Sequence, residues 1–419
     1  MPMERIVRIP KKLDKECFSD PRLRRLFTKP QWAHFRSLVL AFMITTWRHT
    51  ISGLDRALAF GPHRTKRRDF AVISPWEGAS VLRTVARIRL EKLGVQPGET
   101  IRLVLDDSHA RKYGKKMQGA GKYRDMSTQS FLWGHNFIVG GLVYRGQFIP
   151  YDLRLSMKPG WCRKLGKEFK TLPELAAAIV RSLDVAKEMG LKVEVLFDAG
   201  YMNRKVVSAV VAMGWTYFST LPSNRAIKVH GRWTHVKDYR RCIPKRQYRA
   251  VTCHTEEGAK TYWATSRKLW LKSIGKVTVV FSKRKRGERA LPLVTNAVGL
   301  SRREILERYS LRWLIEGFFK SGKQILGLAE DQTGKAEGIE KHLRLVAIVY
   351  SLLVQGIQGW EPTERARRER RKKDLDPLSL MKAREVAREI VFEDLLDFLE
   401  ESADPKEIVR KLRELARAA

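Results

Sequence analysis

A change of hydrophobic period near residue 100 constrains the fold of this chain more than any other feature. Up to about residue 96, apolar residues recur at three- and four-residue spacing, as they do in helices. From Thr100 they form short β-branched runs bounded by Gly or charged residues, as strands do. Strands are expected at 101–105, 135–143, 147–155, 192–197 and 216–221, and helices at 173–189 and 204–213. The order β-β-β-α-β-α-β predicts an α/β domain that follows a small helical domain.

The segment after Pro222 is strongly basic and rich in predicted strands. Residues 223–299 hold 19 Lys or Arg and only 4 acidic residues, a net charge of +15. Helical periodicity resumes at 302–326 and 341–355. Within the basic segment, strand-like runs occur at 247–254, 260–267, 276–282 and 291–295, with tryptophans interleaved among them. We therefore expect a basic β-rich insertion in the core.

The C-terminal region changes character twice. Seven of the nine residues 365–373 are basic, which is typical of a solvated linker. From Leu375 onward, 8 basic and 11 acidic residues give an amphipathic tail, suited to docking or capping rather than to DNA binding. The whole pattern predicts an N-terminal helical DNA-binding domain (1–98), a core in two parts (99–222 and 300–358) around the insertion (223–299), and a basic linker with a helical region (359–419).

The charge balance indicates a nucleic acid partner. The 419 residues include 82 Lys or Arg and 45 Asp or Glu, so the formal net charge is +37, which attracts polyanions. The four cysteines form no C-x-x-C pair, which disfavours a disulfide framework or a zinc site. The longest apolar runs are too short to cross a bilayer, and no export signal is evident. We expect no membrane partner and a cytoplasmic protein associated with the nucleoid.

Acidic residues follow two of the predicted strands. Asp106 and Asp107 come after the run 101–105, and Asp198 follows the run 192–197. Carboxylates at the carboxyl ends of strands are well placed to hold a metal ion. Because neighbouring residues of a strand face opposite sides, only one of Asp106 and Asp107 is expected to join Asp198.

A third acid lies on one face of the helix predicted at 302–326. Tyr309, Arg312, Glu316 and Lys323 have offsets of 0, 3, 7 and 14 residues, which fall within an arc of about 60° on a helix. Two divalent cations about 4 Å apart, held by carboxylates, activate a hydroxyl and stabilise the leaving oxygen of a phosphodiester. Glu316 is the expected ligand, Arg312 and Lys323 would neutralise phosphates, and Tyr309 would donate a hydrogen bond to one.

The spacing Tyr309-x-x-Arg312-x-x-x-Glu316-(six residues)-Lys323 resembles the Y-R-E-K signature of DDE-type insertion-sequence transposases. Leu105-Asp-Asp-Ser108 resembles the first-aspartate motif of that family, and Phe197-Asp-Ala-Gly-Tyr201 resembles the second. The resemblance implies an RNase H-like, mixed-sheet catalytic core with a β-rich insertion before the helix that bears the glutamate. It also implies cut-and-paste DNA transposition by metal-dependent strand cleavage and 3′-hydroxyl strand transfer.

The same resemblance implies the site and its partners. Asp107, Asp198 and Glu316 would be the catalytic metal ligands for two magnesium ions, with manganese as a substitute. We favour Asp107 over Asp106 because the family aspartate often precedes Ser or Thr, as Asp107 precedes Ser108. The partners would be double-stranded DNA, as terminal inverted repeats and target, and a second protomer in a homodimeric synaptic complex.

Two questions stay open at the level of sequence. Some lineages of the family pass through a DNA hairpin with a flipped base stacked on an aromatic residue, for which Trp233, Trp263 and Trp270 are candidates, although tryptophans in such a segment also serve as sheet packing. The alternatives to a transposase are an RNase H-like host nuclease and a domesticated DNA-binding protein without catalysis.

Overall fold

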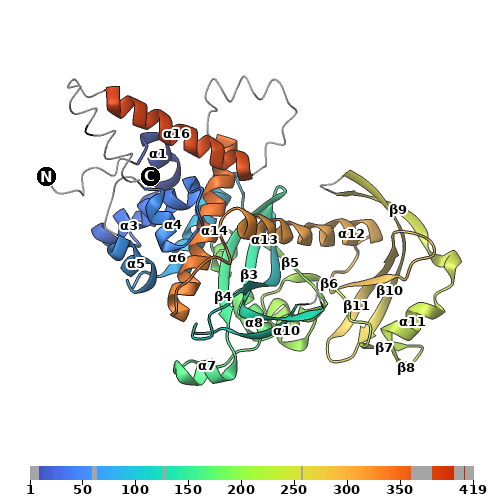
Figure 1. The fold of residues 1–419 in the computed structure, drawn as a ribbon. Helices are drawn as coiled ribbons and strands as arrows, with labels where there is room; N and C mark the ends of the chain where they lie inside the picture. The colour runs from blue at the N-terminus through green and yellow to red at the C-terminus, as the bar shows by residue number, and fades with distance from the viewer. Residues whose placement is uncertain are drawn as a thin grey trace. The chain divides into compact units, whose positions relative to one another are not determined.

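The computed structural model describes residues 9–58, 64–125, 129–255, 258–359, 380–400 and 410, and the basic run 365–373 lies outside them (Figure 1). The chain divides into two compact units. The helical unit comprises Met1–Lys92, His109–His135 and Phe318–Ala419. The sheet unit comprises Leu93–Ser108 and Asn136–Gly317.

The helical unit is built on an aromatic core. Its helices are α1 (Lys11–Phe18), α2 (Pro21–Arg24), α3 (Lys29–Ile44), α4 (Ile51–Arg56), α5 (Arg64–Val72), α6 (Gly78–Lys92), α14 (Ala336–Gly359) and α16 (Leu380–Glu400). Thr28 and Gln31 form a capping box that starts α3, which satisfies backbone amides at its first turn. Phe35 is fully buried and stacks on Phe27 and Trp32. The long helix α14 packs on α3, α5 and α6.

Helix α16 closes the carboxyl end of α3. Arg384 is buried and donates hydrogen bonds to the carbonyl oxygens of Met43, Thr45 and Ile325. Arg388 donates to the carbonyls of Ile44 and Thr45, at 2.9 and 3.0 Å. The last carbonyls of a helix have no partner within it and carry partial negative charge, so two guanidinium groups satisfy and neutralise them. The amphipathic tail thus includes an intramolecular cap.

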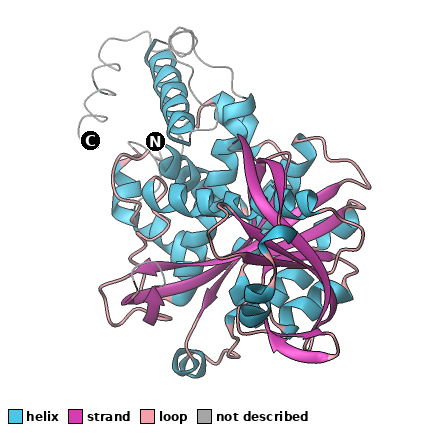
Figure 2. Ribbon diagram, turned by 90° about the vertical axis from the view of Figure 1, so that its right-hand side faces the viewer, coloured by secondary structure: helices cyan, strands magenta, loops and turns pink. Residues whose placement is uncertain are grey.

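The sheet unit contains a mixed sheet with the order β4, β3, β1, β5, β6, β12, β11, β10. The core strands are β1 (Thr100–Arg111), β3 (Ser130–Tyr144), β4 (Gln147–Ser156), β5 (Lys192–Phe197) and β6 (Thr216–Thr220). Strands β1, β5 and β6 are parallel neighbours, whereas β3 and β4 pair antiparallel. Figure 2 shows the strands of the structure in magenta and its helices in cyan. This architecture confirms the α/β class and agrees with an RNase H-like core.

Helices of the sheet unit differ in detail from the sequence-based expectation. They are α7 (Pro159–Lys164), α8 (Leu172–Arg181), α9 (Asp184–Glu188) and α10 (Arg204–Ala212). The helix expected at 173–189 is two helices, because Leu183 leaves helical geometry with ψ of 61°. The carbonyl of Ser182, at the same break, accepts a hydrogen bond from the Tyr151 hydroxyl. Helices α8 and α10 pack against each other.

The insertion has more elements than expected. Beyond β9 (Arg249–Thr255), β10 (Gly258–Leu271), β11 (Gly275–Lys283) and β12 (Leu291–Thr295) it contains β7 (Ala226–Val229), β8 (Arg232–His235), α11 (Val236–Cys242) and the 3₁₀ turn η3 (Lys245–Gln247). His230 and Gly231 both have positive φ, so they form the kind of two-residue turn that joins hairpin strands β7 and β8. The short strand β2 (Gly121–Asp125), which pairs with the start of β3, was not expected either. None of the described helices combines the length and apolar character that a membrane crossing needs.

Candidate active site

The parallel register of β1 and β5 brings two aspartates side by side. The strand expected at 101–105 continues to Arg111, so Asp106 and Asp107 lie within β1 and not after its end, where the sequence analysis had expected them. Leu105 lies opposite Phe197, so Asp106 and Asp198 are the next residues of the two chains. Paired positions of neighbouring strands point to the same face. Asp198 then caps the 3₁₀ turn η2 (Ala199–Tyr201), because its Oδ1 accepts from the Gly200 amide at 2.8 Å. The turn fixes this carboxylate at the strand end.

Asp107 has a different neighbour from Asp106. Its Oδ1 accepts a hydrogen bond of 2.6 Å from the hydroxyl of Tyr201, a residue of η2 that is 3% exposed. Its backbone amide donates to Oδ1 of Asp106 at 2.9 Å. The tyrosine of the Asp-Ala-Gly-Tyr motif therefore anchors the second residue of the Asp-Asp pair, a role that the sequence analysis did not assign to it.

The glutamate arrives on a helix that is interrupted at the site. The single helix expected at 302–326 consists of α12 (Arg302–Ser310), the 3₁₀ turn η4 (Leu311–Trp313) and α13 (Leu314–Gln324). A 3₁₀ turn has fewer residues per turn than an α-helix, so an arc calculated for one continuous α-helix does not apply across it. Arg312 lies in η4 and is buried, whereas Glu316 lies in the first turn of α13.

Arg312 joins the two acidic elements. Its Nη1 donates to Oδ2 of Asp106 at 2.8 Å, and its Nη2 donates to Oε1 of Glu316 at 2.9 Å. The Arg312 side chain is 10% exposed and that of Asp106 18%, so this pair is shielded from solvent, whereas the Glu316 side chain is 40% exposed. One guanidinium thus links an aspartate of β1 to the helix glutamate.

Negative charge dominates this site. Burial, with the nearby Asp198 and Asp107, raises the pKa of Asp106 to about 7, although Arg312 acts in the opposite direction. Burial and the Asp107 carboxylate also raise the pKa of Tyr201 well above its usual value, so its hydroxyl stays protonated and donates. For Arg312, burial lowers the pKa, but the charges of its neighbours Tyr309, Asp106 and Glu316 outweigh this effect and raise it overall. These shifts show a site with more carboxylate than cation.

The donor set suits a hard cation, because carboxylate oxygens are the ligands that magnesium prefers. Within the described ranges, however, no group of three His, Cys, Asp or Glu side chains is close enough to hold a metal ion. The guanidinium of Arg312 bonds to both Asp106 and Glu316, so it satisfies the oxygens that a cation would use. The excess of carboxylates over cations fits a divalent cation in its chemistry. In this structure, however, Asp106 and Glu316 are oriented toward Arg312.

The remaining helix residues lie in two different settings. Tyr309 is only 8% exposed, and burial raises its pKa, so it is part of the packed interior of the sheet unit. Lys323 follows on α13 but belongs to the helical unit. Desolvation lowers its pKa, and Asp125 of the same unit opposes that shift. Two of the four predicted residues, Arg312 and Glu316, therefore lie beside the aspartates. Tyr309 is buried close to Arg312.

The three candidate tryptophans lie on two strands of the insertion. Trp233 on β8 and Trp270 on β10 are 49% and 54% exposed, and each is the register partner of Lys228 on β7. They therefore flank Lys228 on one face. Trp263, also on β10, is half-buried and has the Arg286 guanidinium 4.0 Å above its ring. The first two present open aromatic surface, whereas the third is covered by a cation.

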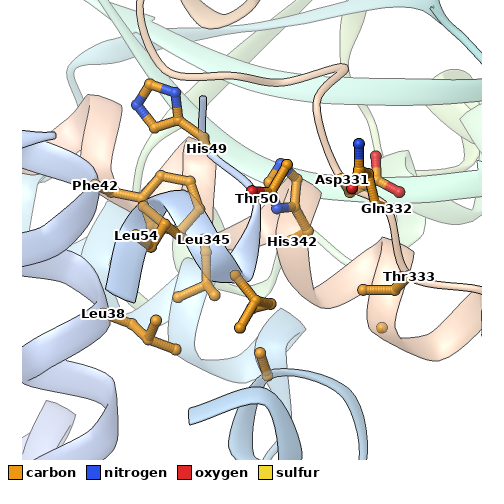
Figure 3. A pocket seen from close by; sticks show the side chains of 13 residues that line it. Leu38, Phe42, His49, Thr50, Leu54, Asp331, Gln332, Thr333, His342 and Leu345 are labelled. Atoms are coloured by element: carbon orange, nitrogen blue, oxygen red, sulfur yellow. The ribbon is translucent and has the colours of Figure 1, made fainter. Parts of the chain in front are cut away.

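A small cavity in the helical unit is not a second candidate site. It has a volume of about 20 Å³, close to the space that one water molecule fills. Figure 3 shows the side chains of Phe42, Leu54 and Leu345 along one part of its wall, with His49 and His342 nearby. The cavity is too small for a substrate, so it is a packing feature of this unit.

Part of the chain that carries this cluster matches a known protein family. Residues 168–352 match the family model described as the transposase DDE domain. The match includes Asp198, Arg312 and Glu316, and it begins after Asp106 and Asp107. The chain has no match among the curated proteins.

Proposed function

The chain belongs to the DDE-type transposases, and on that premise we propose that it catalyses cut-and-paste DNA transposition. In this reaction one strand is hydrolysed at each element end, and the released 3′-hydroxyl attacks target DNA. The contact that carries the proposal is the bridge from Asp106 through Arg312 to Glu316, beside Asp198. It gathers the acids of three separate motifs in one site.

We assign the carboxylate roles from these contacts. Asp198 and Glu316 are proposed as metal ligands, as the sequence predicts. For the first aspartate the contacts support Asp106, which faces Arg312 and shares its electrostatic surroundings with Asp198. Asp107, our sequence-based preference, bonds to the Tyr201 hydroxyl and is the alternative ligand.

Two magnesium ions, or manganese in their place, would supply the Lewis acidity that activates the attacking hydroxyl and stabilises the leaving oxygen. The chain's own residues do the positioning. Gly200 and Tyr201 hold Asp198 and Asp107 by hydrogen bonds, so these carboxylates lose little freedom when they bind a ligand. Arg312, once released by the carboxylates, is placed to neutralise a phosphate next to the cleaved bond.

The remaining DNA contacts follow from charge and exposure. Lys323 is proposed to bind a flanking phosphate, and Tyr309 to support Arg312 from the buried side of the helix. Trp233 and Trp270, with Lys228 between them, offer stacking surface for an unpaired base. We propose DNA ends and target DNA as the partners, with a homodimer as the synaptic form.

A strand-cleavage assay tests this function. The substrate is labelled DNA that carries the inverted repeat flanking the gene, with magnesium or manganese present. We expect cleavage at the repeat boundary by the unsubstituted protein and a loss of more than about a hundredfold in Glu316→Gln, because even indirect partners of metal ligands contribute about 10- to 100-fold. Both proteins should bind the repeat with similar affinity.

Glu304→Gln is the matched control. It makes the same change of charge on α12, the helix before the turn η4, and glutamine also satisfies the capping box that Glu304 forms with Ser301. Cleavage without regard to the repeat would indicate the host nuclease instead. Binding without cleavage by any of the three proteins would indicate the domesticated DNA-binding protein.

A second pair of variants decides the first ligand. Asp106→Asn should abolish cleavage, whereas Asp107→Asn should reduce it by about 10- to 100-fold, as expected for a residue that positions a ligand. Tyr201→Phe removes the hydroxyl that bonds to Asp107 and should match Asp107→Asn. Full activity in Asp106→Asn, with none in Asp107→Asn, would reverse the assignment.

A further inference from the structure

The insertion contains a concave site that the proposed chemistry does not use. We call it the basic pocket. It has a volume of about 360 Å³, in the range of small-ligand sites, and two aromatic rings form part of its wall. Its five cationic side chains are Lys245, Arg246, Arg249, Lys283 and Arg286.

Three separate stretches of chain form this pocket. Trp263 on β10 lies directly opposite Lys283 on β11, so strand register places these two side chains on one face, and Arg249 is the first residue of β9. The turn η3 leads into β9 and supplies Lys245 and Arg246. Arg286 comes from the loop after β11.

The aromatic rings of the pocket hold its cations in place. The Arg286 guanidinium lies 4.0 Å from the centroid of Trp263, and the Lys283 ammonium lies 4.4 Å from the centroid of Tyr248. Tyr248 is buried, so its ring is a fixed support. Cation–π contacts of this kind attract and orient the charge without neutralising it. A base that stacked on this face of Trp263 would have to displace Arg286.

The cations of the pocket have no carboxylate partner among the described residues. Across the part of the chain that the structure describes, none of the five forms an ion pair with a carboxylate, whereas Arg241 and Arg303 of the same unit do. Five like charges around one concavity repel one another and raise the local concentration of anions. An external polyanion is the partner that removes this repulsion.

We propose that the basic pocket binds the phosphodiester backbone of a DNA strand and neither reads nor stacks its bases. The inference rests on the proposed function, since it takes DNA as the polyanion. Arginine and lysine contacts to phosphate give affinity and register but carry no sequence information. Trp263, a candidate base platform from its sequence, becomes a support for Arg286.

The test measures how DNA binding depends on salt. The triple variant Arg249→Gln, Lys283→Gln, Arg286→Gln is titrated with fluorescent DNA duplexes of several unrelated sequences over a range of potassium chloride concentrations. Each lost phosphate contact lowers the slope of log affinity against log salt by about 0.9. We expect the slope to fall by about 2 to 3, with the same loss of affinity for every sequence.

The matched control is Lys187→Gln, Lys192→Gln, Arg204→Gln. These three exposed cations lie in the sheet unit outside the insertion, so the total charge changes equally. The control should retain the slope of the unsubstituted protein. Equal slopes for the two triple variants would overturn the pocket alone, while failure of the unsubstituted protein to bind any DNA would overturn the proposed function with it.

Trp263→Leu separates phosphate binding from base stacking. Leucine removes the ring that supports Arg286, so we expect a modest loss of affinity that is equal for a plain duplex and for a duplex with one unpaired base. A loss confined to the DNA with the unpaired base would show that Trp263 stacks on bases and would overturn the proposal.

Discussion

The active site and the basic pocket belong to one unit, yet they handle charge in opposite ways. In the active site one guanidinium is shared between two carboxylates, and further carboxylates stand nearby. In the pocket, aromatic rings hold the cations, and no carboxylate of the described chain pairs with them. This difference indicates which kind of ligand each region would bind. The active site has surplus negative charge and suits a cation, whereas the basic pocket has surplus positive charge and suits an anion.

This contrast extends to stability. A carboxyl group whose pKa rises on folding opposes folding once it is ionised. Exposed cations on a surface, by comparison, affect stability little. The active site should therefore reduce the stability of the fold in exchange for function, whereas the basic pocket should be nearly neutral.

The largest effect is expected at Asp106. Its pKa rises from 3.8 to about 7, so the folded protein keeps a proton there that the unfolded chain releases, and stability falls as pH rises through that interval. By about pH 8 the ionised carboxylate costs up to about 4 kcal/mol, and at pH 5 about 1.6 kcal/mol. Asp106→Asn should therefore raise the free energy of unfolding more than twice as much at pH 8 as at pH 5, as measured by urea denaturation.

Asp238→Asn is the control for that measurement. Asp238 forms an exposed pair with Arg241, and its substitution should change the free energy of unfolding by less than about 0.5 kcal/mol at either pH. If Asp106→Asn gave the same gain at both pH values, ionisation of Asp106 would not be the cause.

A smaller effect, and one of opposite sign, is expected when the shared cation is removed. Arg312→Met leaves Asp106 and Glu316 without their common partner, and breaking a buried ion pair costs about 3 kcal/mol. The loss should be greatest near pH 8 and smaller near pH 5, where Asp106 takes up a proton. Arg303→Met, which breaks an exposed pair with Glu307, provides the comparison. Equal losses in the two variants would refute the bridging role of Arg312.

The smallest effect is expected in the basic pocket. Arg286→Gln should change the free energy of unfolding by less than about 0.5 kcal/mol, since no internal ion pair is lost. Its salt slope for DNA binding should nevertheless fall by about 1. A decrease in the free energy of unfolding well above 1 kcal/mol would mean that another group of the chain neutralises Arg286. The active site and the basic pocket would then no longer differ in how their charges are paired.

Much of the fold could be predicted because its signals are local. The β-branched runs located β5, β6 and the first half of β1, and the run at 291–295 coincides with β12. The second half of β1, which contains Asp106 and Asp107, was expected to follow the strand. The break between α8 and α9 was missed because it depends partly on Tyr151, a residue far away in sequence. The turn η4 was missed because a period of 3.6 residues continues smoothly through its sequence.

The site was predictable as a set of motifs but not as a set of contacts. The motifs named Asp198, Arg312 and Glu316 as candidates, and the structure brings Arg312 and Glu316 to Asp106. The relation of Asp106 to Asp198 depends on the register of β1 against β5, which no single motif contains. The basic pocket depends in part on the register of β10 against β11, so the sequence showed its charge and Trp263 without showing their arrangement.

The cap that α16 places on α3 has a consequence for the time course of folding. Arg384 and the Met43 carbonyl are separated by 341 residues. At a synthesis rate of about 5 to 20 residues per second, α3 leaves the ribosome about 20 to 70 seconds before the helix that closes it. The segments of the sheet unit end at Gly317, well before α16. The ribosome therefore completes the synthesis of the sheet unit before it makes α16. The helical unit, although its first helices are made earliest, cannot form the cap on α3 until then.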